Sequence, residues 1–410
     1  MTSTNASTPS AAAPAARPLP LPRRCRQVLS LADFEELARR HLPRPIHAYV
    51  SGAVEDNASL AENRRAFADL ALVPRMLVGV SRRDASFELF GRRYSAPFGL
   101  APMGISALSA YRGDLVLAQA AQQAAVPAIM SGSSLIRLEE VMAAAPHTWF
   151  QAYLPGDQAQ IDALLDRVAA AGVQTLVITV DLPVAANREN NVRAGFSTPL
   201  RPSLGLAWQG ISHPRWLFGT FLKTLLRHGM PHFENNYAHR GAPILSSSVL
   251  RDFSDRSHLA WSHLKAIRHR WQGQLVVKGI LAAEDAVLAR EHGADAIIVS
   301  NHGGRQLDGA VAPLRVLPGI LRAVPGMPVM LDSGVRRGTD VVKALALGAR
   351  CVFVGRPFNY AAAVAGRAGV DHAIALLREE VSRDMGMLGA TRLDQLGPAC
   401  VRPVHAWDAF

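Results

Sequence analysis

A base and a cation stand close together where an apolar run of the sequence ends. The run Ala296–Val299 leads into "SNHGGRQLDG", which places His302 and Arg305 on either side of a glycine pair. An imidazole has an ordinary pKa of about 6.5 and can take a proton near neutral pH. A guanidinium can bind a carboxylate through two parallel hydrogen bonds. The stretch therefore favours a proton-transfer site over the alternative, in which His302 is an ordinary core histidine.

A regular series of short apolar runs surrounds this stretch. Helical spacing fills most gaps, as at 161–168 and 341–345, and glycines at 172, 293 and 348 end the predicted helices. Strands that are apolar throughout and alternate with helices indicate a parallel sheet covered on both faces. The runs are 97–101, 126–131, 148–153, 175–181, 275–278, 296–300, 328–332 and 351–355.

The number of runs predicts an α/β fold of the (β/α)8 barrel type. The chain before residue 97 forms an N-terminal extension, and a long insertion, residues 197–258, follows the fourth predicted strand. A doubly wound open sheet is the rival, but no G-x-G-x-x-G pattern follows an early strand. A barrel carries its active residues at the C-terminal strand ends. Those ends are polar here, at Ser131, Gln151, Tyr153, Thr179, Asp181, Lys278, Ser300, His302, Asp332 and Arg356.

Composition narrows the class of protein. The chain has 410 residues, of which 49% are hydrophobic and 19% charged, as expected for a large globular core. Three widely spaced cysteines argue against a disulfide framework or a zinc site, so no metal is expected. The net charge of +11 favours anionic partners. No nucleic-acid motif is present and aromatics make up only 6%, so nucleic acid ranks last.

The two ends of the chain are predicted to lie outside the barrel. The first 24 residues are rich in Ala, Pro, Ser and Thr and lack the pattern of a secretory signal. We expect a disordered tail over residues 1–27, a barrel domain over 28–400 and a short tail over 401–410. No apolar run reaches the length of a membrane-spanning helix.

Three motifs, "SNHGGRQLDG", "DSGVRRGTD" and "VGRP", resemble those of the FMN-dependent (S)-2-hydroxy-acid dehydrogenase and oxidase family. The resemblance runs from about residue 31 to about residue 396. It implies a (β/α)8 barrel, FMN as cofactor and oxidation of a 2-hydroxy acid, of the L-lactate or (S)-mandelate class, to the 2-oxo acid. It also implies a homo-oligomer, often a tetramer.

The resemblance implies a role for each site residue. His302 matches the catalytic base and Asp181 the carboxylate that stabilises its imidazolium. Arg188 and Arg305 match the substrate arginines, and Tyr49 and Tyr153 the active-site phenols. Lys278 matches the cation beside the flavin. The remaining matches line the flavin ring, ribityl chain and phosphate: Ala101, Pro102, Met103, Gly104, Ser131, Gln151, Thr179, Ser300, Asp332, Ser333, Gly334, Val335, Arg336, Gly355 and Arg356.

Two features bear on the electron acceptor. Gly104 stands where oxidases of the family often carry alanine, which favours a dehydrogenase that passes electrons to a quinone. Ser133 replaces a tryptophan of glycolate oxidase and leaves room for a bulkier substrate. An oxidase that releases hydrogen peroxide is the alternative. A barrel that binds FMN or phosphate without redox work is a third reading, which the complete set of site residues disfavours.

The insertion carries a possible membrane contact. Residues 204–232 mix aromatic and aliphatic residues with Arg215, Lys223 and Arg227, as in a segment that lies in a membrane interface. Packing on the barrel or in a subunit interface is the alternative. We expect a cytoplasmic protein, peripheral on the cytoplasmic face of the inner membrane.

Overall fold

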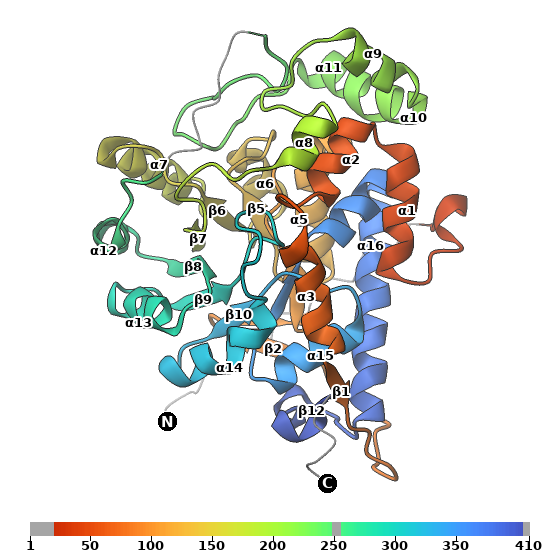
Figure 1. Ribbon diagram of the computed structural model, residues 1–410, viewed down its shortest axis with the longest axis vertical. Helices are drawn as coiled ribbons and strands as arrows, with labels where there is room; N and C mark the ends of the chain where they lie inside the picture. The colour runs from red at the N-terminus through yellow and green to blue at the C-terminus, as the bar shows by residue number, and fades with distance from the viewer. Residues whose placement is uncertain (1–19, 248–255, 405–410) are drawn as a thin grey trace, which may run out of the picture.

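The computed structural model describes residues 20–247 and 256–404, and eight parallel strands form its centre (Figure 1). Their order is β4-β11-β10-β9-β8-β7-β6-β5, and a parallel bridge between Leu100 and Ala128 joins the two ends of that series. The predicted (β/α)8 barrel is confirmed. The strands are β4 (Phe98–Leu100), β5 (Ile129–Ser131), β6 (Trp149–Ala152), β7 (Thr175–Thr179), β8 (Gln274–Ile280), β9 (Ala296–Val299), β10 (Val329–Leu331) and β11 (Val352–Val354).

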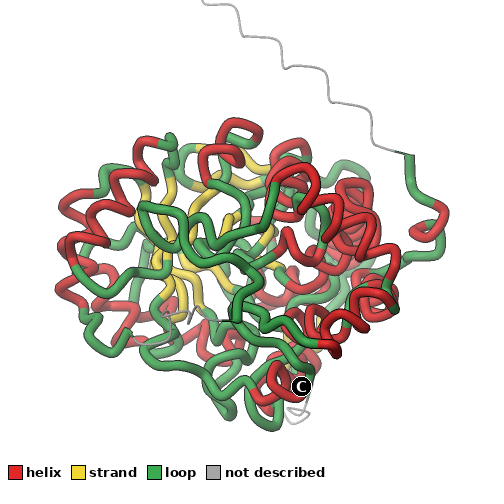
Figure 2. The backbone as a smooth tube through the Cα atoms, turned by 90° about the horizontal axis from the view of Figure 1, so that it is seen from above, coloured by secondary structure: helices red, strands yellow, loops and turns green. Residues whose placement is uncertain are grey.

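Helices surround the strands, as the view from above shows (Figure 2). The chain returns from each strand to the next through at least one helix, which is the right-handed βαβ arrangement of a barrel. In chain order these helices are α4 (Ser106–Ser109), α5 (Gly113–Gln123), α6 (Leu138–Ala144), α7 (Gln158–Ala170), α12 (Trp261–Arg270), α13 (Ala283–Glu291), α14 (Pro313–Ala323), α15 (Gly338–Ala346) and α16 (Arg356–Met387). The helix α16 is interrupted at Ala365 and Gly366, whose backbone angles are not helical.

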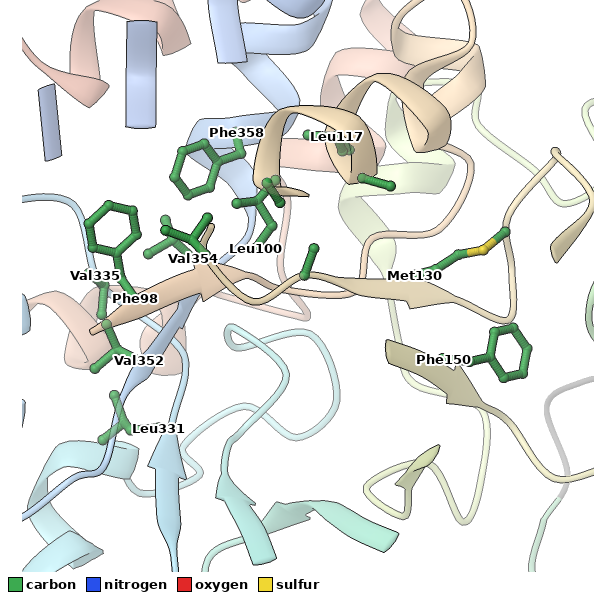
Figure 3. Close-up of a cluster of buried hydrophobic side chains, with 14 of the residues drawn as sticks. Phe98, Leu100, Leu117, Met130, Phe150, Leu331, Val335, Val352, Val354 and Phe358 are labelled. Carbon is green, nitrogen blue, oxygen red and sulfur yellow. The ribbon is translucent and has the colours of Figure 1, made fainter. Parts of the chain in front are cut away.

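Alternate residues of each strand enter two different cores. Outward side chains pack under the helices, and Figure 3 shows part of this layer, with Phe98, Leu100, Val352 and Val354 near Leu117 of α5 and Phe358 of α16. Inward side chains fill the barrel itself. This inner core contains Ala101, Ile129, Trp149, Val177, Val276, Ala296, Ile298, Met330, Cys351 and Phe353.

The N-terminal extension covers both ends of the barrel. A hairpin of β2 (Phe87–Leu89) and β3 (Arg92–Tyr94) adds Phe87, Leu89 and Tyr94 to the inner core. The helices α1 (Leu31–His41), α2 (Arg44–Ser51) and α3 (Ala58–Ala68) precede it, and α1 packs along α16. The extension therefore closes the N-terminal end of the barrel and supplies α2 and α3 to the other end, where the site lies.

The structure differs from the predicted limits at both ends of the domain. Cys25, placed by prediction in the tail 1–27, is fully buried, and Arg23–Cys25 forms a 3-10 helix. Val401–Pro403, expected in the C-terminal tail, is β12 and pairs antiparallel with β1 (Leu70–Leu72). Strand pairing across most of the chain leaves no local pattern in the sequence. Residues 1–19 and 405–410 of the predicted tails lie outside the described residues.

The insertion between β7 and α12 forms a separate group of helices. These are α8 (Glu189–Arg193), α9 (Leu204–Ile211), α10 (Pro214–Trp216), a π-helical turn at Leu217–Phe221 and α11 (Leu222–His228). In Figure 1, α9, α10 and α11 lie together at the top of the view, outside the ring of barrel helices. Residues 248–255 of the predicted insertion lie outside the described part of the chain. No helix among the described residues is long and apolar enough to cross a membrane.

Candidate active site

A cavity of about 330 Å³ opens at the C-terminal end of the barrel. It is open to solvent and lies where the strand ends and the following loops converge. Most of the predicted site residues line it: Tyr49, Ala101, Pro102, Met103, Gly104, Tyr153, Thr179, Arg188, Lys278, His302, Arg305, Asp332, Ser333, Gly334, Val335, Arg336, Gly355 and Arg356. The other four, Ser131, Gln151, Asp181 and Ser300, are not part of its lining.

Those four lie directly behind the lining. Asp181 bonds to His302, and Ser300 accepts a hydrogen bond of 2.9 Å from Lys278 Nζ. Ser131 donates to Gln151 Oε1 at 3.2 Å, and both side chains are buried. The structure therefore brings every predicted site residue to one end of the barrel.

His302 and Asp181 form a hydrogen-bonded pair. Nδ1 of His302 lies 2.9 Å from Oδ1 of Asp181. The backbone of His302 is left-handed, with φ of 56°, and Ser300 Oγ accepts a bond from its main-chain N–H at 3.0 Å. Gly279, which follows Lys278, allows Asp181 to lie close to the strand. A Cβ at this glycine would lie 2.7 Å from Asp181 Cβ. The geometry fixes Nδ1 on the carboxylate and leaves Nε2 to act in the cavity.

Burial and the nearby positive charges favour the neutral form of this imidazole. Burial lowers the pKa of His302, and the positive charges of Lys278 and Arg188 oppose the raising effect of Asp181. Burial would raise the pKa of Asp181, but His302, Lys278 and Arg188 together hold it below its ordinary value. A neutral imidazole on an ionised carboxylate is ready to accept a proton.

Two partly buried arginines lie beside the pair without a carboxylate of their own. Neither Arg188 nor Arg305 makes an ion pair with any residue in the described ranges. Burial, followed by the charge of Arg188, lowers the pKa of Arg305 to about 9. Two like charges held together in a partly buried site create a preference for an anion.

Arg305 also holds the N-terminal extension in place. Its Nη1 donates to the carbonyl oxygens of Tyr49 and Gly52, each at 2.7 Å. These carbonyls end α2, where the helix dipole favours a cation. The guanidinium carbon lies 5.0 Å from the Tyr49 ring centre, and that ring packs 4.6 Å from the ring of Phe196. The α2 helix thereby brings Tyr49 to the cavity.

Tyr153 provides a second phenol. It follows β6, and burial raises its pKa, so the hydroxyl stays protonated and can donate a hydrogen bond. Gly104 matters to the first phenol, since a Cβ there would lie 2.8 Å from the Tyr49 hydroxyl and 3.1 Å from Ser133 Cβ. The glycine therefore keeps open the space between β4 and α2.

Lys278 is a charged residue in the upper layer of the barrel interior. Its ammonium forms an ion pair of 3.1 Å with Asp332, and both side chains are nearly inaccessible to solvent. Burial would lower the pKa of Lys278, but Asp332 and Asp181 raise it above its ordinary value. Lys278 is therefore a fixed positive charge at the floor of the cavity.

One corner of the cavity is suited to a phosphate. Burial lowers the pKa of Arg336, and burial followed by the charge of Arg336 lowers the pKa of Arg356 to about 10. Neither forms an ion pair within the described part of the chain. The loop that begins at Ser333 leads into α15, and α16 begins at Arg356, so two helix N-termini lie nearby. A Cβ at Gly303 would lie 2.7 Å from Arg356 Nη1, so a side chain there would displace the guanidinium, and the φ of 67° also favours glycine.

Buried polar atoms without partners mark where a flavin would fit. Nε2 of Gln151 and Oγ1 of Thr179 are buried and make no hydrogen bond within the described structure. Such atoms are costly unless a ligand supplies partners. The polar edge of an isoalloxazine ring carries both donors and acceptors and could satisfy them, with Lys278 beside it. The donor set and the phosphate corner therefore fit FMN.

Several residues of the site escaped prediction. Asp340 accepts hydrogen bonds from the main-chain N–H groups of Arg336 and Arg337, at 2.8 and 3.0 Å, and pairs with Arg64 of α3. Gln306 bonds to Arg188. Asp340 and Gln306 lie inside the motifs "DSGVRRGTD" and "SNHGGRQLDG", so the signal was present. Arg256, which lines the cavity from the insertion, stands in no motif.

Comparison with known proteins places this geometry in a family. The model of the FMN-dependent dehydrogenase family matches residues 38–403. An L-lactate dehydrogenase of Caulobacter vibrioides is 42% identical over 372 residues, which cover 88% of this chain and 94% of that protein. An (S)-mandelate dehydrogenase of Pseudomonas putida is 35% identical over 372 residues, with 90% and 93% covered.

Solved structures agree with the sequence relatives. A monotopic membrane protein, (S)-mandelate dehydrogenase, matches with a TM-score of 0.83 and 33% identity, over 92% of this chain and 100% of that chain. A mandelate oxidase variant with (S)-mandelic acid matches with a TM-score of 0.75 and 34% identity, over 92% and 98%. Dehydrogenases and oxidases thus share this fold.

Proposed function

The chain belongs to the FMN-dependent dehydrogenase family, and we propose that it oxidises an (S)-2-hydroxy acid to the 2-oxo acid. The observation that carries the proposal is the imidazole of His302, hydrogen-bonded to Asp181, in the same cavity as two partly buried guanidinium groups that lack carboxylate partners among the described residues. A 2-hydroxy acid supplies what this arrangement lacks, namely a carboxylate for the arginines and a proton for the base. The relatives named L-lactate and (S)-mandelate dehydrogenase support that substrate class.

Each residue has a part that follows from its chemistry. Arg188 and Arg305 bind the substrate carboxylate, which also orients the adjacent carbon. The phenols of Tyr49 and Tyr153 donate hydrogen bonds to substrate oxygens. Nε2 of His302 takes the proton, because Nδ1 is held on Asp181, and the carboxylate stabilises the imidazolium that forms. FMN, when bound, supplies the acceptor for the two electrons.

Lys278 and the phosphate corner hold the cofactor. The ammonium of Lys278 is a fixed positive charge that would stabilise negative charge on a flavin bound beside it. Arg336 and Arg356 bind the phosphate together with main-chain groups of the loop that begins at Ser333. The cavity-lining residues Ala101, Pro102, Met103, Gly104, Thr179, Asp332, Gly334, Val335 and Gly355 would face the flavin. Ser131, Gln151 and Ser300 lie behind this lining and would support the flavin site from there.

A quinone-type molecule is the proposed electron acceptor. Gly104 supports it, since dehydrogenases of the family tend to carry glycine there, and so do the dehydrogenase names of the relatives. The mandelate oxidases among the structural neighbours favour the second candidate, an oxidase that reduces oxygen to hydrogen peroxide. The yield of peroxide per turnover separates the two.

The insertion supports a peripheral membrane contact. Five large apolar side chains of α9–α11 are exposed: Leu204, Trp208, Ile211, Phe218 and Leu226. The predicted apolar segment is divided, however, because Trp216 is buried and donates from Nε1 to the Leu108 carbonyl at 2.8 Å. The outward residues, with basic residues around them, would lie in the interface of the cytoplasmic leaflet. The structure of a monotopic membrane protein, (S)-mandelate dehydrogenase, supports a contact with a membrane.

A charge on the outward face tests the membrane proposal. Trp208→Glu with Leu226→Glu should release the protein from vesicles that contain anionic lipid and leave reduction by an artificial dye unchanged. The deletion of residues 204–232 should do the same but would uncover the Leu108 carbonyl. Gln160→Glu, an exposed change on α7, is the control. A doubly substituted protein that still sediments with vesicles would contradict the proposal.

A homo-oligomer, with a tetramer as the expected form, remains a proposal. The loop after β1 exposes Met76, Leu77 and Val78, and Leu77 has a left-handed backbone with φ of 59°. An exposed apolar loop of this kind suits a contact with a second copy. Sedimentation of the holoprotein would measure the number of subunits.

The central experiment is an anaerobic visible spectrum of the holoprotein. The flavin bands should bleach on addition of (S)-mandelate or L-lactate, and slow recolouring in air would indicate a dehydrogenase. Fast recolouring with peroxide would indicate the oxidase. Bands that remain after both acids would refute the proposed substrate class.

A further inference from the structure

The side-chain amide of Gln306 connects the two halves of the candidate site. Its Nε2 donates to the main-chain oxygen of Asp181 at 2.9 Å, and its Oε1 accepts from Nη2 of Arg188 at 2.6 Å. Nε of Arg188 donates in turn to the carbonyl of Arg305 at 3.2 Å. One amide therefore touches both the residue that pairs with the base and an arginine that faces the cavity.

Only a donor and an acceptor on one side chain can make these two contacts. A guanidinium can only donate and a main-chain carbonyl can only accept, so the orientation of the amide is fixed. A glutamate at position 306 could accept from Arg188 but could not donate to Asp181. An asparagine has both groups on a chain that is one methylene shorter. The position therefore requires glutamine for chemical reasons as well as for length.

Arg188 needs such a contact because little else fixes its side chain. It lies in the loop after β7, at the start of the short helix α8, and no carboxylate within the described ranges pairs with it. A free arginine loses considerable rotamer entropy when it binds a ligand. Two hydrogen bonds from its guanidinium to residues 305 and 306 hold it in place before a ligand arrives.

The hydrogen bond from Gln306 to the main chain of Asp181 affects the base, His302, through its partner. Asp181 follows β7, and its carboxylate meets His302 at 2.9 Å only if its main chain is held in register. The bond from Gln306 anchors that main chain next to the arginine. We infer that Gln306 is a positioning residue that aligns Arg188 with the Asp181–His302 pair. The inference rests on the proposed function, since it assumes that Arg188 binds the substrate carboxylate.

A double-mutant cycle tests the inference without turnover. The probes are benzoylformate and pyruvate, two 2-oxo acids, and their binding to the oxidised holoprotein is followed by the change in the flavin spectrum. Gln306→Met, which has similar volume but neither group, should weaken binding about tenfold because a hydrogen bond to a charged group is lost. The same change should have an effect of less than about twofold in an Arg188→Met background. Equal losses in both backgrounds would overturn the inference.

A second variant separates positioning from loss of structure. Gln306→Glu keeps the contact with Arg188 but neutralises its charge, so binding of the probe should fall further, by about 10- to 100-fold. The added negative charge should also raise the pH at which flavin reduction becomes half-maximal. An unchanged pH profile together with normal binding would contradict the role. If the Met variant does not retain FMN, Gln306→Asn replaces it in the cycle, with the same expected loss.

The controls distinguish this inference from the proposed function. Gln272→Met removes an exposed amide outside the site and should leave probe binding unchanged. Wild-type protein that binds the probe but is reduced by neither hydroxy acid would refute the proposed reaction and leave the cycle measurable. If the hydroxy acids reduce the wild-type protein, and Gln306→Met matches it in probe binding and reduction, only the positioning role is refuted.

Discussion

The two ends of the barrel interior are built from the same strands in opposite ways. At the N-terminal end the inward residues are apolar, and the β2–β3 hairpin closes them off with Phe87, Leu89 and Tyr94. Two residues further along the strands the inward positions become polar: Thr179 follows Val177, Lys278 follows Val276, and Asp332 follows Met330. Both layers are buried to a similar degree.

The difference shows what each layer does. Burying a lysine, a histidine and two aspartates costs free energy that apolar residues would not cost. The charged layer also leaves polar atoms of Gln151 and Thr179 without partners. A protein that needed only stability would extend the apolar core to the strand ends. We therefore assign stability to the lower layer and chemistry to the upper one, and substitutions in each layer can test this division.

The largest effect is expected from His302→Ala. Loss of the base should lower the rate of flavin reduction by a 2-hydroxy acid about 10⁴-fold. FMN should stay bound, because its proposed contacts lie on Lys278, Arg336 and Arg356. Anaerobic stopped-flow absorbance measures the rate, and the visible spectrum measures FMN content.

Asp181→Asn tests the partner of the base in the same reaction. It keeps the shape of the pair and removes the charge that stabilises the imidazolium, so a smaller loss is expected than for His302→Ala. A near-normal rate of flavin reduction in His302→Ala would contradict the assignment of chemistry to the upper layer.

The next largest effect belongs to the lower layer. Trp149 is almost fully buried, and its ring lies 5.6 Å from the rings of both Phe90 and Phe353. Trp149→Ala should lower the free energy of unfolding by about 3–5 kcal/mol, because it leaves a cavity. The reduction rate of the folded holoprotein should stay within about twofold of the wild-type rate. Denaturant unfolding and stopped-flow reduction of the same sample measure the two quantities. A lower reduction rate with an unchanged free energy of unfolding would contradict the assignment of stability to the lower layer.

Local patterns in the sequence predicted the barrel well. Each of the eight apolar runs contains or overlaps one barrel strand, because buried parallel strands are apolar along their whole length. The long insertion after β7 is confirmed too. The pairing of Val401–Pro403 with Leu70–Leu72 could not be predicted, since it joins short segments that are far apart in the chain.

The site was predictable where chemistry coincides with a motif. The structure brings His302, Asp181, Arg188, Arg305 and Lys278 together as expected, although their roles stay predictions. The supporting contacts of Gln306 and Asp340 were inside the motifs but depend on which atoms meet in three dimensions. The outward and inward faces of the insertion were mixed in the prediction, because a π-helical turn at Leu217–Phe221 changes the helical phase.

The pH dependence of reduction tests the electrostatics of the upper layer. Only neutral His302 can accept a proton, and burial lowers its pKa from the ordinary value of about 6.5. The rate should therefore stay constant from pH 8 to below about 6.5, and then fall about tenfold for each further pH unit. Lys278→Met removes a positive charge that disfavours the imidazolium, so it should move this fall to higher pH. A fall that already begins above about pH 7 in the wild type would contradict a lowered pKa.

The smallest effect is expected where the phosphate corner meets the charged layer, at Ser333. Its φ of 75° is one that glycine adopts more readily, but its Oγ accepts from Gly303 N–H and donates to Asp332, each at 2.9 Å. Ser333→Gly removes strain and both hydrogen bonds, so the free energy of unfolding should change by less than about 1 kcal/mol. Ser333→Ala removes the bonds and keeps the strain, so it should be about 1 kcal/mol less stable than Ser333→Gly.

The same pair of variants also reports on Lys278. Without the bond from Ser333, the Asp332 carboxylate should offset the positive charge of the Lys278 ammonium more strongly. The midpoint potential of the bound flavin should therefore fall by about 10–20 mV, which is roughly 0.5–1 kcal/mol for a two-electron couple. Both variants should show this fall, since both lack the hydroxyl, whereas only Ser333→Ala should lose stability. Equal stability of the two variants would show that the left-handed backbone carries no strain. An unchanged potential would show that Ser333 shapes the loop without tuning the charged layer.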